Sequence, residues 1–309
     1  MLCFLRLVVF WVEDKMNKAI LRFPQFKVKA FTLSFDDGLK YDEKLISVMD
    51  KYSFKGTFNI NSGLLASSPQ EYGIHTRLTL DECVALYQRS DNEVAVHGKH
   101  HVPLVGVERG VAINEVISDR CDIEKAFNKV VKGMAYPYGG SFDNETKQIV
   151  KDCGIEYSRT CDDTYSFELP TDWITLNPTC HQKDERLLKL AKEFSDFSIE
   201  EGGYDWFRKT PKWFLLWGHS TEYAIDDSWH LLEKLGEILG NRQDVWYATT
   251  GEIYNYVRAF ESLKFSVDNR FVENSSAIDV YLTINGQNYI ATAGKTVKIG
   301  ELSKGKELL

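Results

Sequence analysis

The sequence predicts an α/β protein in which helices surround a parallel sheet or barrel of short strands, followed by a small β-rich appendage. Between residue 30 and about residue 260, short β-type runs alternate with amphipathic helical stretches, the pattern of strand-helix repeats. After about residue 262, alternating and β-branched runs replace this pattern. The 309 residues suit one large domain with an appendage.

The elements of the main domain can be placed in order. Eight runs are predicted strands: 30–35, 55–60, 93–96, 132–136, 155–158, 173–176, 213–217 and 244–248. Thr79 and Glu82 have capping-box spacing, which predicts a helix that runs to about Arg89. Acidic residues open a second helix, 228–239, and Gly240 ends it.

Both ends of the chain depart from this pattern. Residues 263–309 contain β-type runs around Asn285-Gly286, a strong hairpin turn, so we expect a β appendage packed on the main domain. Residues 2–12 are apolar but too short to span a membrane, and they lack the flanks of a signal peptide. We therefore expect translation to begin natively at Met16, with 1–15 a non-native extension and 16–262 the main domain.

Composition limits the function classes. The 43% hydrophobic and 27% charged residues describe an ordinary soluble globular protein. The net charge of -8, without a basic stripe, argues against nucleic acid as a partner. The six cysteines, irregularly spaced and without a Cys-x-x-Cys pair, suggest reduced thiols. We expect a cytoplasmic protein that binds neither nucleic acid nor membrane; the sequence does not indicate the oligomeric state.

The first candidate site is Asp36-Asp37-Gly38, directly after the apolar run 30–35. Both acids then lie at the carboxyl end of a strand, the edge where α/β folds build their sites. One carboxylate can hold a cation while its neighbour handles a proton. The alternative is a solvated Asp-Gly turn, which is common.

A histidine cluster follows the strand 93–96. His97 and His101 are four residues apart, so on a helical turn their rings share one face and can bind a cation together with Asp37. Two histidines and one carboxylate leave positions for water and substrate, as in catalytic sites. His100 is an alternative ligand by spacing, and a hydrogen-bonded loop histidine is the simpler explanation for any one of these residues.

On these motifs the chain resembles the polysaccharide deacetylases of carbohydrate esterase family 4, over roughly residues 28–260. Four motifs of that family have counterparts here: Ser34-Phe35-Asp36-Asp37-Gly38, His97-x-x-x-His101, Ala135-Tyr136-Pro137-Tyr138-Gly139 and Leu215-Leu216-Trp217-Gly218-His219. The resemblance implies Asp36 as catalytic base, Asp37, His97 and His101 as metal ligands, and His219 as general acid. It further implies that the Tyr138 N–H stabilises the oxyanion, and that the fold is a distorted (β/α) barrel, usually seven-stranded.

One departure from the family pattern concerns an arginine. The family's third motif begins with an Arg that pairs with the catalytic carboxylate, and Ala135 stands here instead. Arg159 or His181 are candidates to replace it. Asp172-Trp173 is a weak counterpart of the family's Asp-Trp motif, and a structural Trp under a loop explains it equally well.

Several other residues are candidates for the substrate groove. We expect Pro137, Tyr138, Tyr223, His181 and Arg159 to line it. His230 lies in an apolar-spaced helix and is expected to pack there. The following loop residues and tryptophans have a possible role in sugar contact but are expected to be solvated or in the core: Tyr72, His75, Arg77, Trp206, Trp213, Trp217 and Trp246.

The function expected from the resemblance is metal-dependent removal of N- or O-acetyl groups from a carbohydrate. Zinc is the first choice for the cation, and cobalt, nickel or iron also suit two imidazoles and one carboxylate. Two alternatives stay open: hydrolysis of a non-sugar amide, and a carbohydrate-binding protein that keeps the fold without turnover.

Overall fold

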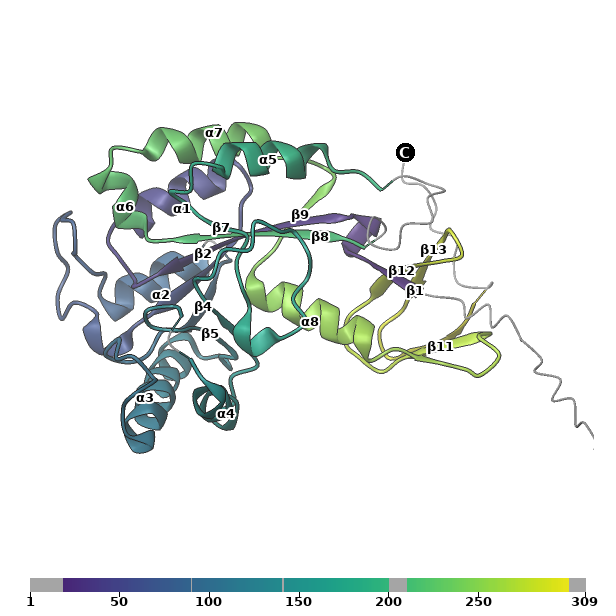
Figure 1. Ribbon diagram of the computed structural model, residues 1–309, viewed down its shortest axis with the longest axis horizontal. Coiled ribbons are helices and arrows are strands. Elements are labelled where there is room, and N and C mark those ends of the chain that lie inside the picture. Colours follow the sequence, from purple (N-terminus) through teal and green to yellow (C-terminus); the bar gives the residue numbers. More distant parts are fainter. Residues whose placement is uncertain (1–18, 90, 141, 200–209, 300–309) are drawn as a thin grey trace, which may run out of the picture.

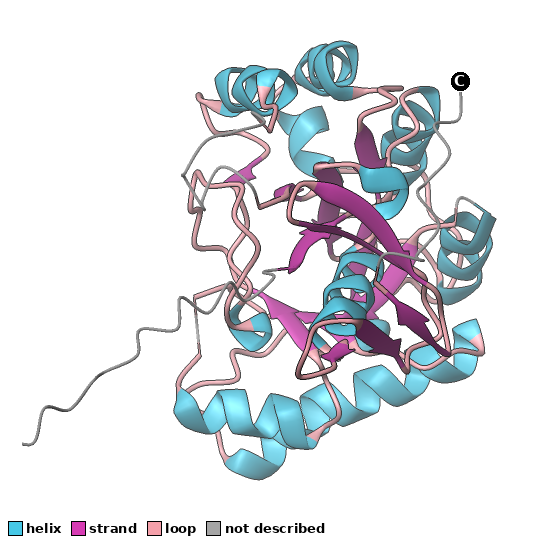
Figure 2. Ribbon diagram, turned by 90° about the vertical axis from the view of Figure 1, so that its right-hand side faces the viewer, coloured by secondary structure: helices cyan, strands magenta, loops and turns pink. Residues whose placement is uncertain are grey.

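A central sheet of parallel strands with helices around it forms the main body of the protein (Figures 1 and 2). The computed structural model describes residues 19–89, 91–140, 142–199 and 210–299, so Cys3, Met16 and Trp206 lie outside the described residues. Seven strands follow in the order β6-β5-β4-β3-β2-β8-β7, and β9 also pairs with β2. Their bounds are β2 (Lys29–Asp36), β3 (Gly56–Ile60), β4 (Glu93–Val96), β5 (Gly133–Ala135), β6 (Tyr157–Arg159), β7 (Cys180–His181), β8 (Lys212–Gly218) and β9 (Val245–Tyr247).

The two ends of this sheet approach one another, so that the sheet curls into a distorted barrel. Arg159 at the end of β6 forms a parallel bridge with Leu176, and the chain then continues into β7, which pairs with β8. The expected α/β fold, a distorted seven-stranded (β/α) barrel with a C-terminal β appendage, is confirmed.

One predicted strand is wrong. Residues 173–175 form a 3-10 helix, η3 (Trp173–Thr175), and the strand beside β8 is the short β7. The Asp172 side chain accepts a hydrogen bond from the Ile174 N–H at 3.0 Å. Such a local bond stabilises a helical turn over an extended strand, despite the β-favouring Trp, Ile and Thr that follow.

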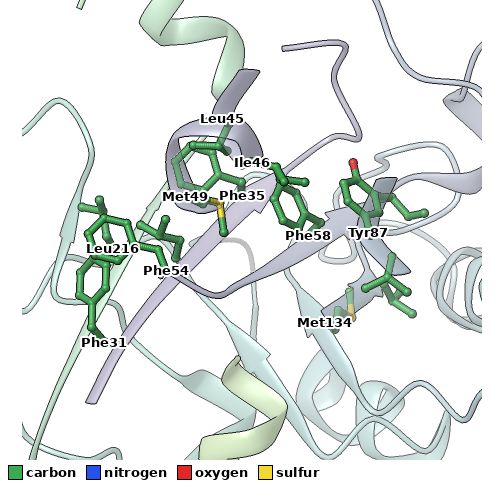
Figure 3. Packing of buried hydrophobic residues seen from close by; sticks show 14 of the residues in the cluster. Phe31, Phe35, Leu45, Ile46, Met49, Phe54, Phe58, Tyr87, Met134 and Leu216 are labelled. Carbon is green, nitrogen blue, oxygen red and sulfur yellow. The ribbon is translucent and has the colours of Figure 1, made fainter. Parts of the chain in front are cut away.

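The alternation of side chains along β2 separates the core from the site. Phe31, Leu33 and Phe35 point outward, into the layer between sheet and helices. Figure 3 shows Leu45 of α1 (Asp42–Lys51) beside Phe35 in this layer. The alternate residues of β2, which end in Asp36, face the barrel interior. A strand with an apolar outer face and a polar end therefore fixes Asp36 at the carboxyl edge.

The helices cover the sheet on both sides in Figure 1. Their bounds are α1 (Asp42–Lys51), α2 (Leu80–Arg89), α3 (Arg109–Phe127), α4 (Asn144–Asp152), α5 (Leu187–Asp196), α6 (Ser220–Ile225), α7 (Trp229–Leu239) and α8 (Thr250–Glu261); the short η1 (Pro24–Phe26) and η2 (Ser62–Leu64) are 3-10 helices. The predicted capping box of α2 is confirmed: the Thr79 N–H donates to Glu82 at 2.8 Å, and the Glu82 N–H donates to the Thr79 hydroxyl at 3.2 Å. The predicted helix 228–239 corresponds to α7.

The C-terminal strands form two antiparallel three-stranded sheets, β1-β12-β13 and β10-β11-β14. Their bounds are β1 (Ala19–Arg22), β10 (Lys264–Phe265), β11 (Phe271–Asn274), β12 (Val280–Ile284), β13 (Gln287–Ala291) and β14 (Lys295–Lys298). The predicted hairpin is confirmed, since Ile284 pairs with Gln287 and both turn residues, Asn285 and Gly286, have positive φ. The first strand of the described residues, β1, pairs with β12 rather than with the barrel.

Helix α8 joins the appendage to the barrel (Figure 1). The Tyr256 hydroxyl of α8 donates to the Arg22 carbonyl at 2.8 Å and accepts from the Tyr281 N–H at 2.9 Å. No helix within the described ranges is long and apolar enough to cross a membrane. The five described cysteines are all free thiols.

Candidate active site

The two adjacent acids are separated by a sharp turn at the end of β2. Asp37 has φ 84° and Gly38 has φ 65°. Positive φ is strained for an aspartate but natural for glycine. The Asp37 N–H donates to the Asn59 carbonyl at 2.8 Å, which anchors the turn to β3. Because of this turn, Asp36 stays in the barrel interior while Asp37 is half-buried at the rim.

Asp36 is 4% exposed and is held by a buried network. The guanidinium of Arg159 donates to both carboxylate oxygens, and Asn59 Nδ2 donates to Oδ1 at 2.8 Å. Arg159 Nε also donates to the Ser34 hydroxyl at 3.0 Å. Burial by itself would raise the pKa of Asp36, but Arg159, with His97 and His219, outweighs burial and holds the pKa well below its usual range. Asp36 is therefore an ionised, well-oriented carboxylate.

Arg159 occupies the place next to the residue that departs from the family motif. In the parallel pairing of β5 with β6, Ala135 and Arg159 are direct partners. Direct partners on neighbouring strands project to the same face of a sheet. An arginine on β6 thus reaches the carboxylate that an arginine at position 135 would approach from β5.

Three potential metal ligands converge beside Asp36. One ligand atom each from Asp37, His97 and His101 lies within 4.8 Å of the others. The two Nε2 atoms of His97 and His101 are 3.2 Å apart. Burial lowers the pKa of His101 to about 4, and the neighbouring His97 adds to this effect, so His101 is neutral at pH 7 with a lone pair to offer. Two imidazoles and a carboxylate are donors that zinc accepts readily.

The orientation of His97 fits the role of a ligand. Its Nδ1 lies 2.8 Å from the Ala135 carbonyl, which can only accept, so Nδ1 carries the proton and Nε2 faces the site. Its backbone N–H points to Asp119 Oδ2 at 3.0 Å. A carbonyl bonded to the rear nitrogen is the usual support of a metal-binding histidine. The residues present therefore fit a divalent cation.

His100 does not share this site. Its Nδ1 lies 2.8 Å from Glu115 Oε1, and its backbone N–H donates to Glu115 Oε2 at 2.7 Å. Residues 97–101 also form a turn rather than the helical turn expected from their spacing: Gly98 has φ 74° and His101 has φ 56°. This turn brings the His101 ring back against His97 and directs His100 outward.

His219 follows β8 on the opposite side of Asp36. Its Nε2 lies 4.0 Å from Asp36 Oδ2, and its Nδ1 lies 3.3 Å from Glu222 Oε1. Burial opposes the charged imidazolium, but Glu222, Asp36 and Asp37 outweigh burial and raise the pKa of His219. Asp36 and His219 are thus biased toward opposite protonation states, one ionised and one protonated.

Tyr138 lies at the mouth of the site. Its φ is 56°, its side chain is 62% exposed, and its ring meets that of His101 edge-on at 4.5 Å. Among the described residues, none accepts a hydrogen bond from the Tyr138 N–H. Pro137 is buried against Gly98, where an added Cβ would lie 3.1 Å from Pro137 Cγ. Pro137 therefore shapes the His97–His101 turn.

Several predicted groove residues lie elsewhere. Tyr223 is 1% exposed and packs between Phe35 and Trp229, so its expected place in the groove is wrong. The proposed Asp-Trp counterpart is also wrong in space, because Trp173 packs on Trp213 in the core. Both errors have one cause: an amphipathic aromatic near a catalytic motif is more useful to the barrel as core than as a sugar platform.

The remaining predicted residues are partly engaged within the protein. Arg159 is 3% exposed and faces Asp36 rather than the solvent, so it does not line a groove. His181 lies 3.1 Å from Glu222 Oε2 and packs edge-on against Trp217. Of the loop residues, His75 is exposed and the Tyr72 hydroxyl donates to Glu43 at 2.7 Å.

Sequence reasoning missed the residues that orient the ligands. Arg77 donates to the carbonyl of Asp37 and, at 3.2 Å, to its Oδ1. Asn61 Nδ2 donates to the carbonyls of His97 and Gly98, both at 2.7 Å. Asn59 and Asn61, at alternate positions at the end of the apolar strand β3, could have been recognised from the sequence, because a buried amide needs hydrogen-bond partners. Arg77 was a candidate for sugar contact only, and nothing in its loop pointed to Asp37.

A model of the polysaccharide deacetylase family matches residues 24–158. No curated protein matches the chain.

Several solved structures are similar to the chain. The deacetylase PplD of Streptococcus pyogenes, in complex with acetate, is 21% identical over 47% of this chain and 61% of that chain, with a TM-score of 0.41, so the alignment spans less than two thirds of PplD. The polysaccharide deacetylase Bc1974 of Bacillus cereus is 18% identical over 78% of this chain and 98% of its own, with a TM-score of 0.44. BA3943 of Bacillus anthracis, a CE4 family pseudoenzyme, is 16% identical over 75% of this chain and 67% of its own, with a TM-score of 0.44.

Proposed function

The chain belongs, through residues 24–158, to the polysaccharide deacetylase family, and on that premise we propose that it is a metal-dependent hydrolase removing N- or O-acetyl groups from a carbohydrate. The observation that carries the proposal is the convergence of Asp37, His97 and His101 within 4.8 Å, next to the separately held carboxylate of Asp36. One ligand, Asp37, is adjacent to the base, Asp36, so the turn after β2 fixes both.

Asp37, His97 and His101 would hold the cation, which would supply Lewis acidity toward the acyl oxygen and water. Asp36 accepts the proton of the attacking water, in an orientation fixed by Arg159 and Asn59. The Tyr138 N–H donates to the developing oxyanion, and its lack of an acceptor among the described residues supports this role.

His219 then protonates the leaving amine or alcohol. Its raised pKa supports a protonated imidazole at the start of the reaction, while the lowered pKa of Asp36 supports an ionised base. The 4.0 Å between His219 Nε2 and Asp36 Oδ2 supports their facing one reaction centre. We propose zinc as the cation, with cobalt, nickel and iron as the other candidates.

Acetate release with and without metal tests this function. The full chain is stripped with a chelator, reloaded with zinc, cobalt or nickel, and assayed on acetylated xylan, on penta-N-acetylchitopentaose and on simple acetamides. We expect metal-dependent acetate release from at least one carbohydrate. Asp37→Ala should lose both bound metal and activity while keeping the wild-type circular dichroism spectrum.

The panel also separates the rival functions. Acetate release from acetamides alone would place the substrate outside the carbohydrates. A native protein that contains no metal, binds a sugar and releases no acetate would contradict the proposal and favour a binding module.

A further inference from the structure

A second group of titratable side chains lies behind His219. His181, His219 and Glu222 each offer one ligand atom within 4.8 Å of the others. Glu222 stands between the two rings: its Oε1 lies 3.3 Å from His219 Nδ1 and its Oε2 lies 3.1 Å from His181 Nε2. The group is either a second metal site or an ion-pair cluster, and the hydrogen bonds decide between them.

The donors around the cluster exclude a metal there. The Lys183 N–H donates to His181 Nδ1 at 3.2 Å, so Nδ1 carries the lone pair and Nε2 carries the proton directed at Glu222. A metal would need the lone pair on Nε2. Gln182 Nε2 also donates to Glu222 Oε2, at 2.9 Å. Glu222 is therefore surrounded by donors, which suit a carboxylate and not a cation.

Gln182 fixes both His219 and its partner. Its Nε2 donates to the His219 carbonyl at 2.8 Å as well as to Glu222. Gly218, the residue before His219, makes this approach possible, because a Cβ added at position 218 would lie 2.5 Å from Gln182 Oε1. The sequence thus keeps room at the end of β8 for a side chain whose amide links the backbone of His219 to Glu222.

The rear nitrogen of His219 needs this partner. His219 Nδ1 is buried and forms no aligned hydrogen bond within the described residues, although Glu222 Oε1 lies at ion-pair distance. Buried polar atoms are almost always satisfied, and a small rotation of the ring aligns Nδ1–H with Glu222. Nε2 is then left facing Asp36 and the reaction centre.

We propose that Glu222 is a positioning residue that holds the His219 ring through Nδ1, and that His181 and Gln182 hold Glu222 in turn. The kinetic consequence of this inference rests on the proposed function, whereas the contact of Glu222 with His219 is independent of it. Glu222 lies in the short helix α6, three residues after His219. The sequence pattern His219-x-x-Glu222 therefore contains both the general acid and the carboxylate that orients it.

The charged groups that face this pair come from four elements. Asp36 on β2 and Asp37 in the turn after it act on His219, together with Glu222 on α6. His181 on β7 and the neighbouring Lys183 act on Glu222. Among the described residues, Glu222 is the one acid within 3.5 Å of a His219 ring nitrogen. Its loss should therefore change the pKa and orientation of the His219 ring more than the loss of any other acid.

Substrates with different leaving groups distinguish a positioning role of Glu222 from a purely structural role. Glu222→Gln keeps the shape of the side chain and removes its charge. With an acetamide substrate, whose amine must be protonated, we expect kcat to fall about 10- to 100-fold with little change in KM, because a positioned acid is worth about 10²–10⁴ in rate. With 4-nitrophenyl acetate, whose phenolate leaves without a proton, kcat should stay within about twofold.

The direction of the pH effect follows from the charge. Removing Glu222 lowers the pKa of His219, so the alkaline limb of the rate profile moves to lower pH. Glu222→Asp retains the charge on a shorter chain and should fall between wild type and Glu222→Gln. Glu237→Gln, on the exposed side of α7, is the matched control and should leave both substrates and the pH profile unchanged.

Histidine-resolved NMR makes the inference independent of turnover. In the metal-free full chain, His219 should titrate at lower pH in Glu222→Gln than in wild type, with the signal assigned by its loss in His219→Gln. A wild-type protein without acetate release would contradict the proposed function and leave this titration valid. An unchanged His219 titration, or an equal loss of rate on both substrates, would overturn the role of Glu222.

Discussion

Replacing Arg159 with methionine should destabilise the protein and remove its activity, because the substitution leaves a buried carboxylate without its counter-ion. Arg159 and Asp36 are 3% and 5% exposed as side chains, and the guanidinium bonds both carboxylate oxygens. Methionine keeps most of the volume, so the cost is electrostatic rather than a cavity. Asn59 remains as a neutral donor to Asp36.

The magnitude follows from burial. Removing one partner of a buried ion pair costs about 3–5 kcal/mol, against a total stability of about 5–15 kcal/mol. The cost should depend on pH. In wild type the lowered pKa of Asp36 contributes stability above the unfolded pKa, and this contribution is lost as pH falls toward the folded pKa. In Arg159→Met, burial raises the pKa of Asp36, so the carboxyl can take up a proton and the difference from wild type shrinks as pH falls from 7 to 5.

The assay is urea denaturation of chelator-treated protein at pH 7 and pH 5, with acetate release measured on the metal-loaded form. Arg258→Met is the matched control: it breaks an exposed pair with Glu261 on α8 and should cost no more than about 1 kcal/mol. A loss below about 1 kcal/mol at pH 7 in Arg159→Met, or retained activity, would refute the reasoning.

The strand register offers a rescue. Ala135 and Arg159 are direct partners, so an arginine at 135 projects into the space that a truncated 159 vacates. The kcat of the double variant Ala135→Arg/Arg159→Ala should therefore be at least about tenfold higher than that of Arg159→Ala. Should the double variant be no more active than Arg159→Ala, the two positions do not share one role.

Three further outcomes are expected. His101→Ala should lose bound metal on dialysis whereas His100→Ala retains it, as metal analysis would show. Burial raises the pKa of Asp42 to about 7, so this carboxyl alone should lower wild-type stability by about 3 kcal/mol between pH 4 and pH 7, and urea denaturation of Asp42→Asn should lack this contribution. Tyr223→Phe removes a buried hydroxyl without a hydrogen bond in the described structure, so stability should change by no more than about 0.5 kcal/mol and KM should be unaffected.

Local sequence patterns predicted the parts of the site that depend on short spacing. Asp36-Asp37 and His97-x-x-x-His101 each lie within a single turn, so their position after a strand is enough to place them at the sheet edge. The fold class followed for the same reason, since every strand-helix unit carries its own periodicity. For the partner of Asp36 the sequence left two candidates, Arg159 and His181, because Arg159 reaches Asp36 across the barrel and only the register of β5 with β6 explains the choice.

Where local composition and tertiary context conflict, sequence reasoning failed. Trp173, Ile174 and Thr175 favour a strand, but the Asp172 side chain caps a 3-10 turn there. Tyr223 lies close to His219 in sequence, yet α6 turns its ring toward Phe35. At residues 173–175 a local bond with the preceding Asp172 overrides the β propensity of the run, and at Tyr223 a contact with Phe35, far away in the sequence, decides the orientation of the ring.

The pairing of β1 with β12 has a consequence for how the chain assembles during synthesis. Leu21 lies opposite Leu282, so β1 waits for a partner that is synthesised about 260 residues later. At about 5–20 residues per second the wait lasts on the order of tens of seconds. The barrel strands can pair with near neighbours meanwhile, and β1 stays a single unpaired strand edge exposed to other chains until the last sheet closes over it.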